Sequence, residues 1–184
     1  MVRYTLDPAS SRFTVQALAC GMLSGLGHSP TFAIREFRGE LRFTPETFAD
    51  ASFHLTVRAD SLTVADSVSP KDREEIERRT REEVLETAKY PEIVYQSTEI
   101  KADKIADNWY RLQITGELSL HGVKKPHPVD AQLRLLDDEV RLSGQCTLSP
   151  SAYRIKPVTA LGGTIKLKDE LKFDFDLVGR KQDE

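Results

Sequence analysis

The chain has 184 residues, of which 39% are hydrophobic and 30% are charged, and its formal net charge is −3. This composition predicts a soluble globular protein and excludes a helical membrane protein and an intrinsically disordered chain. Lys and Arg are scattered among Asp and Glu, so nucleic acid is not an expected partner. The length fits one domain, and we expect residues 1–184 to form it without a linker.

Alternation of apolar and polar residues predicts β-strands along most of the chain. In residues 110–120 the even-numbered side chains are apolar or small, and the odd-numbered ones are polar or charged. The pattern recurs in residues 13–19, 53–57, 129–135, 140–148 and 171–177. Between residues 31 and 43 the apolar positions change from even to odd, which predicts a β-bulge near Arg35 and Glu36.

One segment departs from this alternation. Residues 70–86, PKDREEIERRTREEVLE, are rich in helix formers, and Ser69 precedes Pro70 as the expected N-cap. The apolar stripe at Ile76, Thr80 and Val84 is narrow, so the helix should rest on the surface.

The sequence therefore predicts an all-β fold. We expect an extended antiparallel β-barrel of about eight strands, lipocalin-like, with one surface helix. Turns at residues 106–108 and 136–139 predict two of its hairpins.

Several segments carry a family likeness. Residues 90–100 read YPEIVYQSTEI, residues 116–126 read GELSLHGVKKP, and the end carries GGT at 162–164 and KDEL at 168–171. The opening YTLDPASS and the segment FRGEL at 37–41 add to it. Together, in this order, they resemble the YceI family of lipocalin-like, polyisoprenoid-binding proteins. The resemblance implies an extended barrel, a helix packed over part of it, and an elongated apolar tunnel for an isoprenoid or similar amphiphile.

Two features depart from the family pattern. Residues 149–155, SPSAYRI, lack the Asp and Gly that the family carries after its penultimate strand. The opening MVRYTLD has neither the basic nor the apolar region of a signal peptide, although many family members are exported. We therefore expect a cytoplasmic protein. An exposed strand edge would allow a homodimer, and no integral membrane segment is expected.

The expected function is the binding or carrying of a long-chain apolar ligand, such as a polyisoprenoid or fatty acid, without catalysis or a cofactor. Ten buried methylene groups would contribute about 8 kcal/mol before the cost of association. The same side chains could instead fill a solid core, which would favour a structural or stress-related interaction barrel. The candidate lining residues are Phe13, Val15, Phe32, Ile34, Phe53, Leu55, Tyr95, Leu112, Ile114, Leu133, Phe173 and Phe175.

The candidates for contact with a headgroup at the barrel mouth are His28, Tyr153 and Arg154. The resemblance places Arg154 after a strand end, where a cation could bind a pyrophosphate or carboxylate. His28 could meet His121 or His127 at the same mouth. The spacing of these histidines is not that of a metal site, so no metal is expected.

Two further alternatives concern reactive side chains. Ser24 precedes His28 by four residues, which leaves open an acyl-hydrolase activity at the mouth, but no G-x-S-x-G motif is present. Cys20 and Cys146 are expected to be buried free thiols, unless neighbouring strands bring them together in a disulfide.

Overall fold

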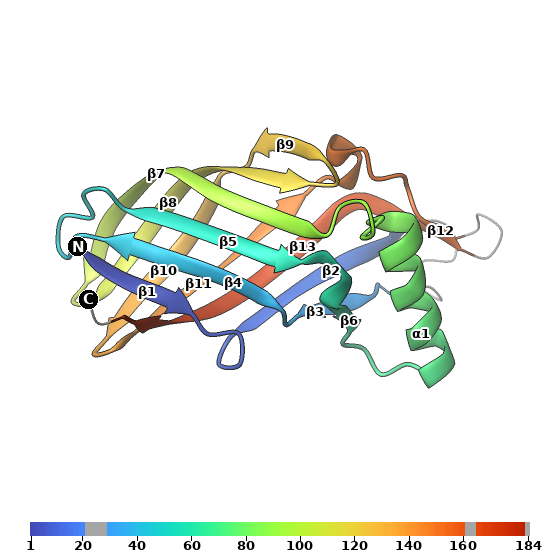
Figure 1. Ribbon diagram of the computed structural model, residues 1–184, viewed down its shortest axis with the longest axis horizontal. Helices are drawn as coiled ribbons and strands as arrows, with labels where there is room; N and C mark the ends of the chain where they lie inside the picture. Colours follow the sequence, from blue (N-terminus) through green and yellow to red (C-terminus); the bar gives the residue numbers. More distant parts are fainter. Residues whose placement is uncertain (21–28, 161–164, 183–184) are drawn as a thin grey trace.

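The computed structural model describes residues 1–20, 29–160 and 165–182. Over these ranges the chain forms one sheet of 13 strands with a helix at one end (Figure 1). The first six strands are β1 (Val2–Leu6), β2 (Arg12–Cys20), β3 (Thr31–Ile34), β4 (Phe37–Phe43), β5 (Ser52–Arg58) and β6 (Leu62–Val64). The others are β7 (Glu92–Ala106), β8 (Trp109–Leu120), β9 (Val123–Pro126), β10 (Val129–Leu136), β11 (Glu139–Leu148), β12 (Thr159–Ala160) and β13 (Ile165–Lys181). The helical elements are α1 (Pro70–Arg79), a π-helical turn (Thr80–Val84) and 3-10 helices at Ala59–Ser61 and Pro150–Tyr153.

Strand β13 closes the sheet into a barrel. One of its edges pairs with β11, and the other pairs with β2 and, further along, with β1. Strands β1 and β2 therefore lie end to end along β13, and they pair in turn with β4 and β3. The result is a closed eight-stranded antiparallel barrel, which confirms the predicted fold class.

The predicted turns lie where the pattern placed them. At Arg35 and Glu36, where a bulge within one strand was predicted, the strand is instead interrupted: these residues separate β3 from β4, and the pairing changes there from β2 to β1. Asp107 and Asn108 join β7 to β8, and Asn108 adopts a φ of 57°, which Asn tolerates better than most residues. Residues 137–138 join β10 to β11.

A filled core occupies the barrel end that carries the N-terminus. The rings of Tyr4 and Phe43 stack with their centroids 5.7 Å apart, and Phe48 lies 4.7 Å from both Phe43 and Tyr110. Offset aromatic contacts of this kind add to the burial of apolar surface. The largest fully buried side chains belong to the same cluster, and they are Phe43, Leu41, Leu112, Leu133 and Val140.

Helix α1 lies across the opposite end of the barrel (Figure 1). It begins as predicted, because the Ser69 hydroxyl accepts a hydrogen bond from the Asp72 N–H at 3.1 Å and Pro70 follows the cap. The Glu77 carboxylate accepts the Val64 N–H at 2.9 Å, and the Arg73 guanidinium donates to the Val64 carbonyl. These side chains satisfy backbone groups along the edge of β6, which would otherwise be exposed. No residue of α1 is fully buried, as expected for a helix on the surface.

The packing of the filled core predicts which substitutions on β10 lower the free energy of unfolding. Leu133 is 0% exposed and Leu136 is 47% exposed, although both lie on β10. Leu133→Ala should lower the free energy of unfolding by about 2–5 kcal/mol, because the substitution leaves a cavity in a packed region. Leu136→Ala should change it by less than about 0.5 kcal/mol. Urea unfolding measures both, and equal effects of the two substitutions would contradict the placement of Leu133 in a filled core.

Candidate ligand-binding cavity

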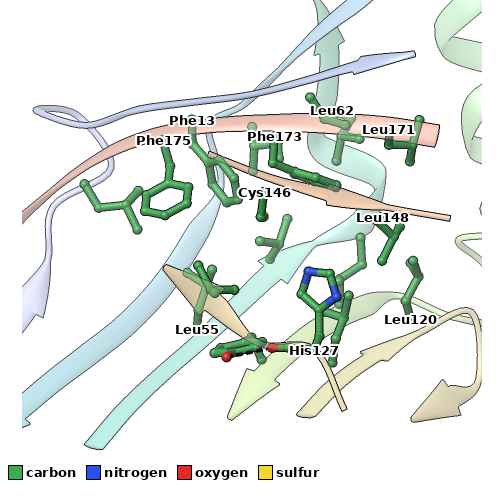
Figure 2. A pocket seen from close by; sticks show the side chains of 18 of the residues that line it. Phe13, Leu55, Leu62, Leu120, His127, Cys146, Leu148, Leu171, Phe173 and Phe175 are labelled. Carbon is green, nitrogen blue, oxygen red and sulfur yellow. Dashed lines mark hydrogen bonds between the residues drawn. The ribbon is translucent and has the colours of Figure 1, made fainter. Parts of the chain in front are cut away.

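A cavity of about 150 Å³ lies inside the barrel, and Figure 2 shows side chains that line it. Strands on all sides of the barrel contribute side chains to its wall, together with Leu85 after the π-helical turn and Ile155 after the 3-10 helix. The other described lining residues are Phe13, Val15, Ile34, Phe53, Leu55, Val57, Leu62, Ile93, Tyr95, Ile114, Leu118, Leu120, His127, Val129, Leu142, Cys146, Leu148, Leu171, Phe173, Phe175 and Leu177.

One wall is built by β2, β13 and β11. Phe13 and Phe175 are partners in register, and the ring of Phe13 lies 6.4 Å from that of Phe175 and 6.3 Å from that of Phe173. Gly144 of β11 pairs with Phe175 of β13. A Cβ atom at position 144 would come within 2.7 Å of the Phe175 ring. A glycine is therefore required for this ring to lie against the sheet.

The opposite wall is held by Tyr95. Its hydroxyl donates to the His127 carbonyl at 3.0 Å and lies 3.4 Å from the Ile114 carbonyl. Gly116 leaves room for the ring, because a Cβ there would approach it to 2.6 Å. Burial raises the pKa of Tyr95 to about 12, so the phenol stays neutral at physiological pH.

The cavity wall carries no charge near neutral pH. Burial raises the pKa of the Cys146 thiol to about 11 and lowers the pKa of His127. None of the described lining residues is Asp, Glu, Lys or Arg. A ligand gains stability in such a site by removing apolar surface from water, and a charged group buried there would be unpaired.

A second apolar cluster closes the cavity near α1. Its buried members are Leu120, Leu148, Tyr153 and Ile155, and Val84 and Leu85 pack against it.

His121 forms hydrogen bonds with two of the segments that surround this cluster. His121 hydrogen-bonds the Glu86 carboxylate through Nε2 at 2.7 Å and the Tyr153 carbonyl through Nδ1 at 3.2 Å. Its ring also lies 4.6 Å from that of Tyr90. These contacts hold the chain after α1 against the end of β8 and the 3-10 helix at Pro150–Tyr153.

Most of the predicted lining residues lie on the cavity wall. Phe32 is buried but is not on the wall, and its backbone pairs with Val15 and Val64. Leu112 and Leu133 are fully buried but are not on the wall, and Leu133 pairs with Tyr110, whose ring packs against Phe48 in the filled core. The predicted residues on the wall are Phe13, Val15, Ile34, Phe53, Leu55, Tyr95, Ile114, Phe173 and Phe175.

The predicted mouth residues lie beside the cavity or outside the described chain. Tyr153 is buried in the second cluster, and Arg154 is exposed with a φ of 59°. Neither is on the wall, whereas the next residue, Ile155, is. His28 and Ser24 lie outside the described residues.

Several lining residues were missed by the sequence reasoning. Leu85 lies one residue beyond the predicted helix stripe, and His127 lines the cavity although the sequence offered it only as one of two histidines that could meet His28 at the mouth. Pro126 and Pro128 restrict the backbone on both sides of His127, but they do not indicate the direction of its side chain.

The remaining candidates from the sequence are the two cysteines, a metal site and a membrane-spanning segment. Cys146 is a free thiol, and the side chain of Cys20 lies outside what the structure describes. Within the described ranges, no group of three or more His, Cys, Asp or Glu side chains could hold a metal ion. The helices described there are too short or too polar to cross a membrane.

A closed eight-stranded barrel with a neutral apolar cavity defines a protein of the lipocalin-like class. Within this class, the YceI-like domain family matches residues 4–179, so the chain belongs to that family.

Curated relatives support the family assignment. Protein YceI of Escherichia coli O17:K52:H18 (strain UMN026) is 31% identical over 121 residues, which are 66% of this chain and 54% of that protein. The UPF0312 protein VPA0850 of Vibrio parahaemolyticus is 29% identical over 126 residues, covering 67% of this chain and 57% of that protein. The chain thus matches little more than half the length of these relatives.

Solved structures share the fold at low sequence identity. Burkholderia cenocepacia BcnA matches with a TM-score of 0.72 and 17% identity, covering 94% of this chain and 98% of BcnA. A polyisoprenoid binding domain from Saccharophagus degradans, implicated in plant cell wall breakdown, matches with a TM-score of 0.69 and 14% identity, covering 99% of this chain and 100% of that domain. The likeness therefore extends over nearly the whole barrel.

The raised pKa of Cys146 predicts slow alkylation of this thiol. A change from 9.0 to about 11 lowers the thiolate fraction at pH 8 about a hundredfold, and the thiolate is the reactive form. In a Cys20→Ser background, iodoacetamide should therefore modify Cys146 at least about a hundredfold more slowly in the folded protein than in denaturant. Mass spectrometry of timed samples measures both rates, and equal rates would show that the thiol is not buried.

Proposed function

We propose that the chain binds a long-chain apolar ligand, such as a polyisoprenoid or a similar amphiphile, in the barrel cavity and carries it without a catalytic step. The uncharged cavity wall is the observation that carries this proposal. The fold shared with a polyisoprenoid binding domain is consistent with it. A hollow interior also favours ligand binding over the alternative of a barrel filled throughout by its own side chains.

The volume of the cavity sets a condition on the ligand. An apolar cavity of about 150 Å³ accepts a molecule of the size of benzene, so a longer chain needs additional room. Leu85 and Ile155 border the cavity near α1, where a longer ligand would have to displace them. Helix α1 has no fully buried residue: Ile76 packs partly buried against the core, and the side chains of Arg73 and Glu77 hydrogen-bond Val64 of β6. A segment with few buried apolar side chains opens at a low cost, so the ligand should enter there.

Filling the cavity should weaken ligand binding. Val129 lines the cavity and Val94 does not, and both are partly buried strand residues. Val129→Phe should weaken the binding of 1-hexanol about tenfold or more, as measured by isothermal titration calorimetry, because the ring occupies ligand space. Val94→Phe is the matched control, because Val94 neither lines the cavity nor packs against the second apolar cluster, and it should bind nearly as the wild type does. Equal binding by wild type and Val129→Phe would contradict the proposed site.

The length of the ligand can be tested separately. Each methylene group removed from water contributes about 0.8 kcal/mol, or about fourfold in affinity. For straight-chain alcohols of four to twelve carbons, we expect the affinity to rise beyond about six carbons, the size that the cavity accommodates as it stands. Isothermal titration calorimetry measures the series, and native mass spectrometry of freshly purified protein tests for a co-purified lipid. A plateau at about six carbons would restrict the function to small apolar ligands.

A further inference from the structure

His121 joins three segments of the chain beside the second apolar cluster. Its Nε2 atom hydrogen-bonds the Glu86 carboxylate at 2.7 Å, and its Nδ1 atom hydrogen-bonds the Tyr153 carbonyl at 3.2 Å. The His121 side chain is 9% exposed, so the ring has little access to water in place of these partners. Each of the three segments also contributes a residue to the cavity wall close to the contact, and these residues are Leu85, Leu120 and Ile155.

Both partners of the ring can only accept hydrogen bonds. A carboxylate and a backbone carbonyl have no hydrogen to donate, so each contact requires an N–H on the His121 nitrogen that faces it. A neutral imidazole carries one N–H, and only the imidazolium carries two. The observed pair of contacts is therefore that of a protonated His121. When the ring loses a proton, a nitrogen lone pair faces either Glu86 or Tyr153, and that hydrogen bond is lost.

The backbone is left-handed at a residue in each of the three segments. Glu86, His121 and Arg154 have φ angles of 46°, 51° and 59°. Arg154 directly follows Tyr153. This conformation is unfavourable for any residue with a Cβ atom, and it persists where surrounding contacts hold it, often in segments that switch between two states. Loss of one His121 contact thus leaves strained segments with fewer contacts to hold them, which favours their separation.

The groups that face His121 include other titratable side chains. The Tyr90 ring lies 4.6 Å from the His121 ring, and Lys89 lies over the Tyr90 ring at 4.9 Å. Interaction with Tyr90 and with Glu86 raises the pKa of Lys89, and burial raises the pKa of Tyr153. Lys and Tyr side chains ordinarily change charge only above about pH 9, and Glu below about pH 5.5. Between these limits, the change of charge among the described side chains at this contact falls on His121.

We propose that His121 is a pH-sensitive latch on the apolar cavity. The imidazolium holds the segment after α1 and the 3-10 helix at Pro150–Tyr153 against the end of β8, and loss of its proton releases one of the two. Leu85 or Ile155 can then move away from the wall, which opens a path for an apolar ligand. The latch is closed at low pH and opens as the pH rises. This proposal rests on the proposed function, because it names how access to the same cavity is controlled.

Hydrogen exchange measures how often the segment after α1 opens. The amides of Leu85, Thr87 and Tyr90 donate to backbone carbonyls, so they exchange when this segment moves away. After correction for the intrinsic effect of pH on exchange, opening should be about tenfold more frequent at pH 8.5 than at pH 5.5, the effect of one lost charge-assisted hydrogen bond. Fluorobenzene suits the size of the cavity, and its exchange with solution, measured by fluorine NMR, should accelerate by a similar factor.

Two substitutions distinguish a pH-sensitive latch from a purely structural contact. Glu86→Gln replaces the carboxylate with an amide, which can donate to one ring nitrogen while the other ring nitrogen donates to Tyr153. The neutral ring then keeps both contacts, so opening should be infrequent at both pH values. His121→Asn removes the titratable ring, and Asn tolerates the φ of 51° but is too short to bridge both partners. Opening should then be frequent at both pH values.

A third variant controls for the loss of a histidine elsewhere. His54 hydrogen-bonds Gln96 and Thr56 and does not line the cavity. His54→Asn should therefore retain the pH dependence of the wild type.

The outcomes separate the latch from the proposed function. If fluorobenzene binds, and its exchange depends neither on pH nor on these substitutions, the latch is refuted while the apolar site stands. Glu86→Gln with the pH dependence of the wild type would also refute the latch, because another group would then be responsible. If fluorobenzene binds at neither pH value, the proposed function fails, and the role of His121 in ligand entry fails with it even where the amides respond to pH.

Discussion

The barrel depends on the double pairing of β13. This strand spans Ile165–Lys181 and is long enough to pair with β11 along one edge and with two successive strands along the other. Without the contacts between β1 and the last residues of β13, the sheet would end in open edges at the N-terminal end. Closure there also fixes the wall that packs around Tyr4 and Phe43, so the filled core and the closed sheet stabilise each other.

The interior combines two regions with different physical roles. Stacked aromatic rings and fully buried leucines fill the N-terminal end, where burial contributes to the stability of the fold. Near α1 the same strands present apolar side chains to an unfilled space, and the glycines at 116 and 144 make room for the rings of Tyr95 and Phe175. The stability of the barrel and the capacity for a ligand are thus provided by different stretches of the same strands.

The sequence predicted the fold well because alternation specifies which side chains face inward. It also located the break at Arg35 and Glu36, where the parity of the apolar positions changes. Alternation carries no information on the position along the barrel axis, so it could not separate Leu112 and Leu133 in the filled core from Ile114 on the cavity wall. Leu85 and His127 were not assigned to the wall because neither belongs to an alternating strand, and their positions depend on tertiary packing.

The contacts of α1 with β6 have a consequence for how the protein behaves in a crowded solution. Arg73 and Glu77 occupy the backbone groups of Val64, so movement of the helix away from β6 would free an N–H and a carbonyl at the same time. Such a free edge can pair with any extended peptide, including a strand of another copy. If the ligand enters at α1 as proposed, weakening these two side-chain contacts would ease its entry and, by the same change, increase the tendency of the protein to aggregate.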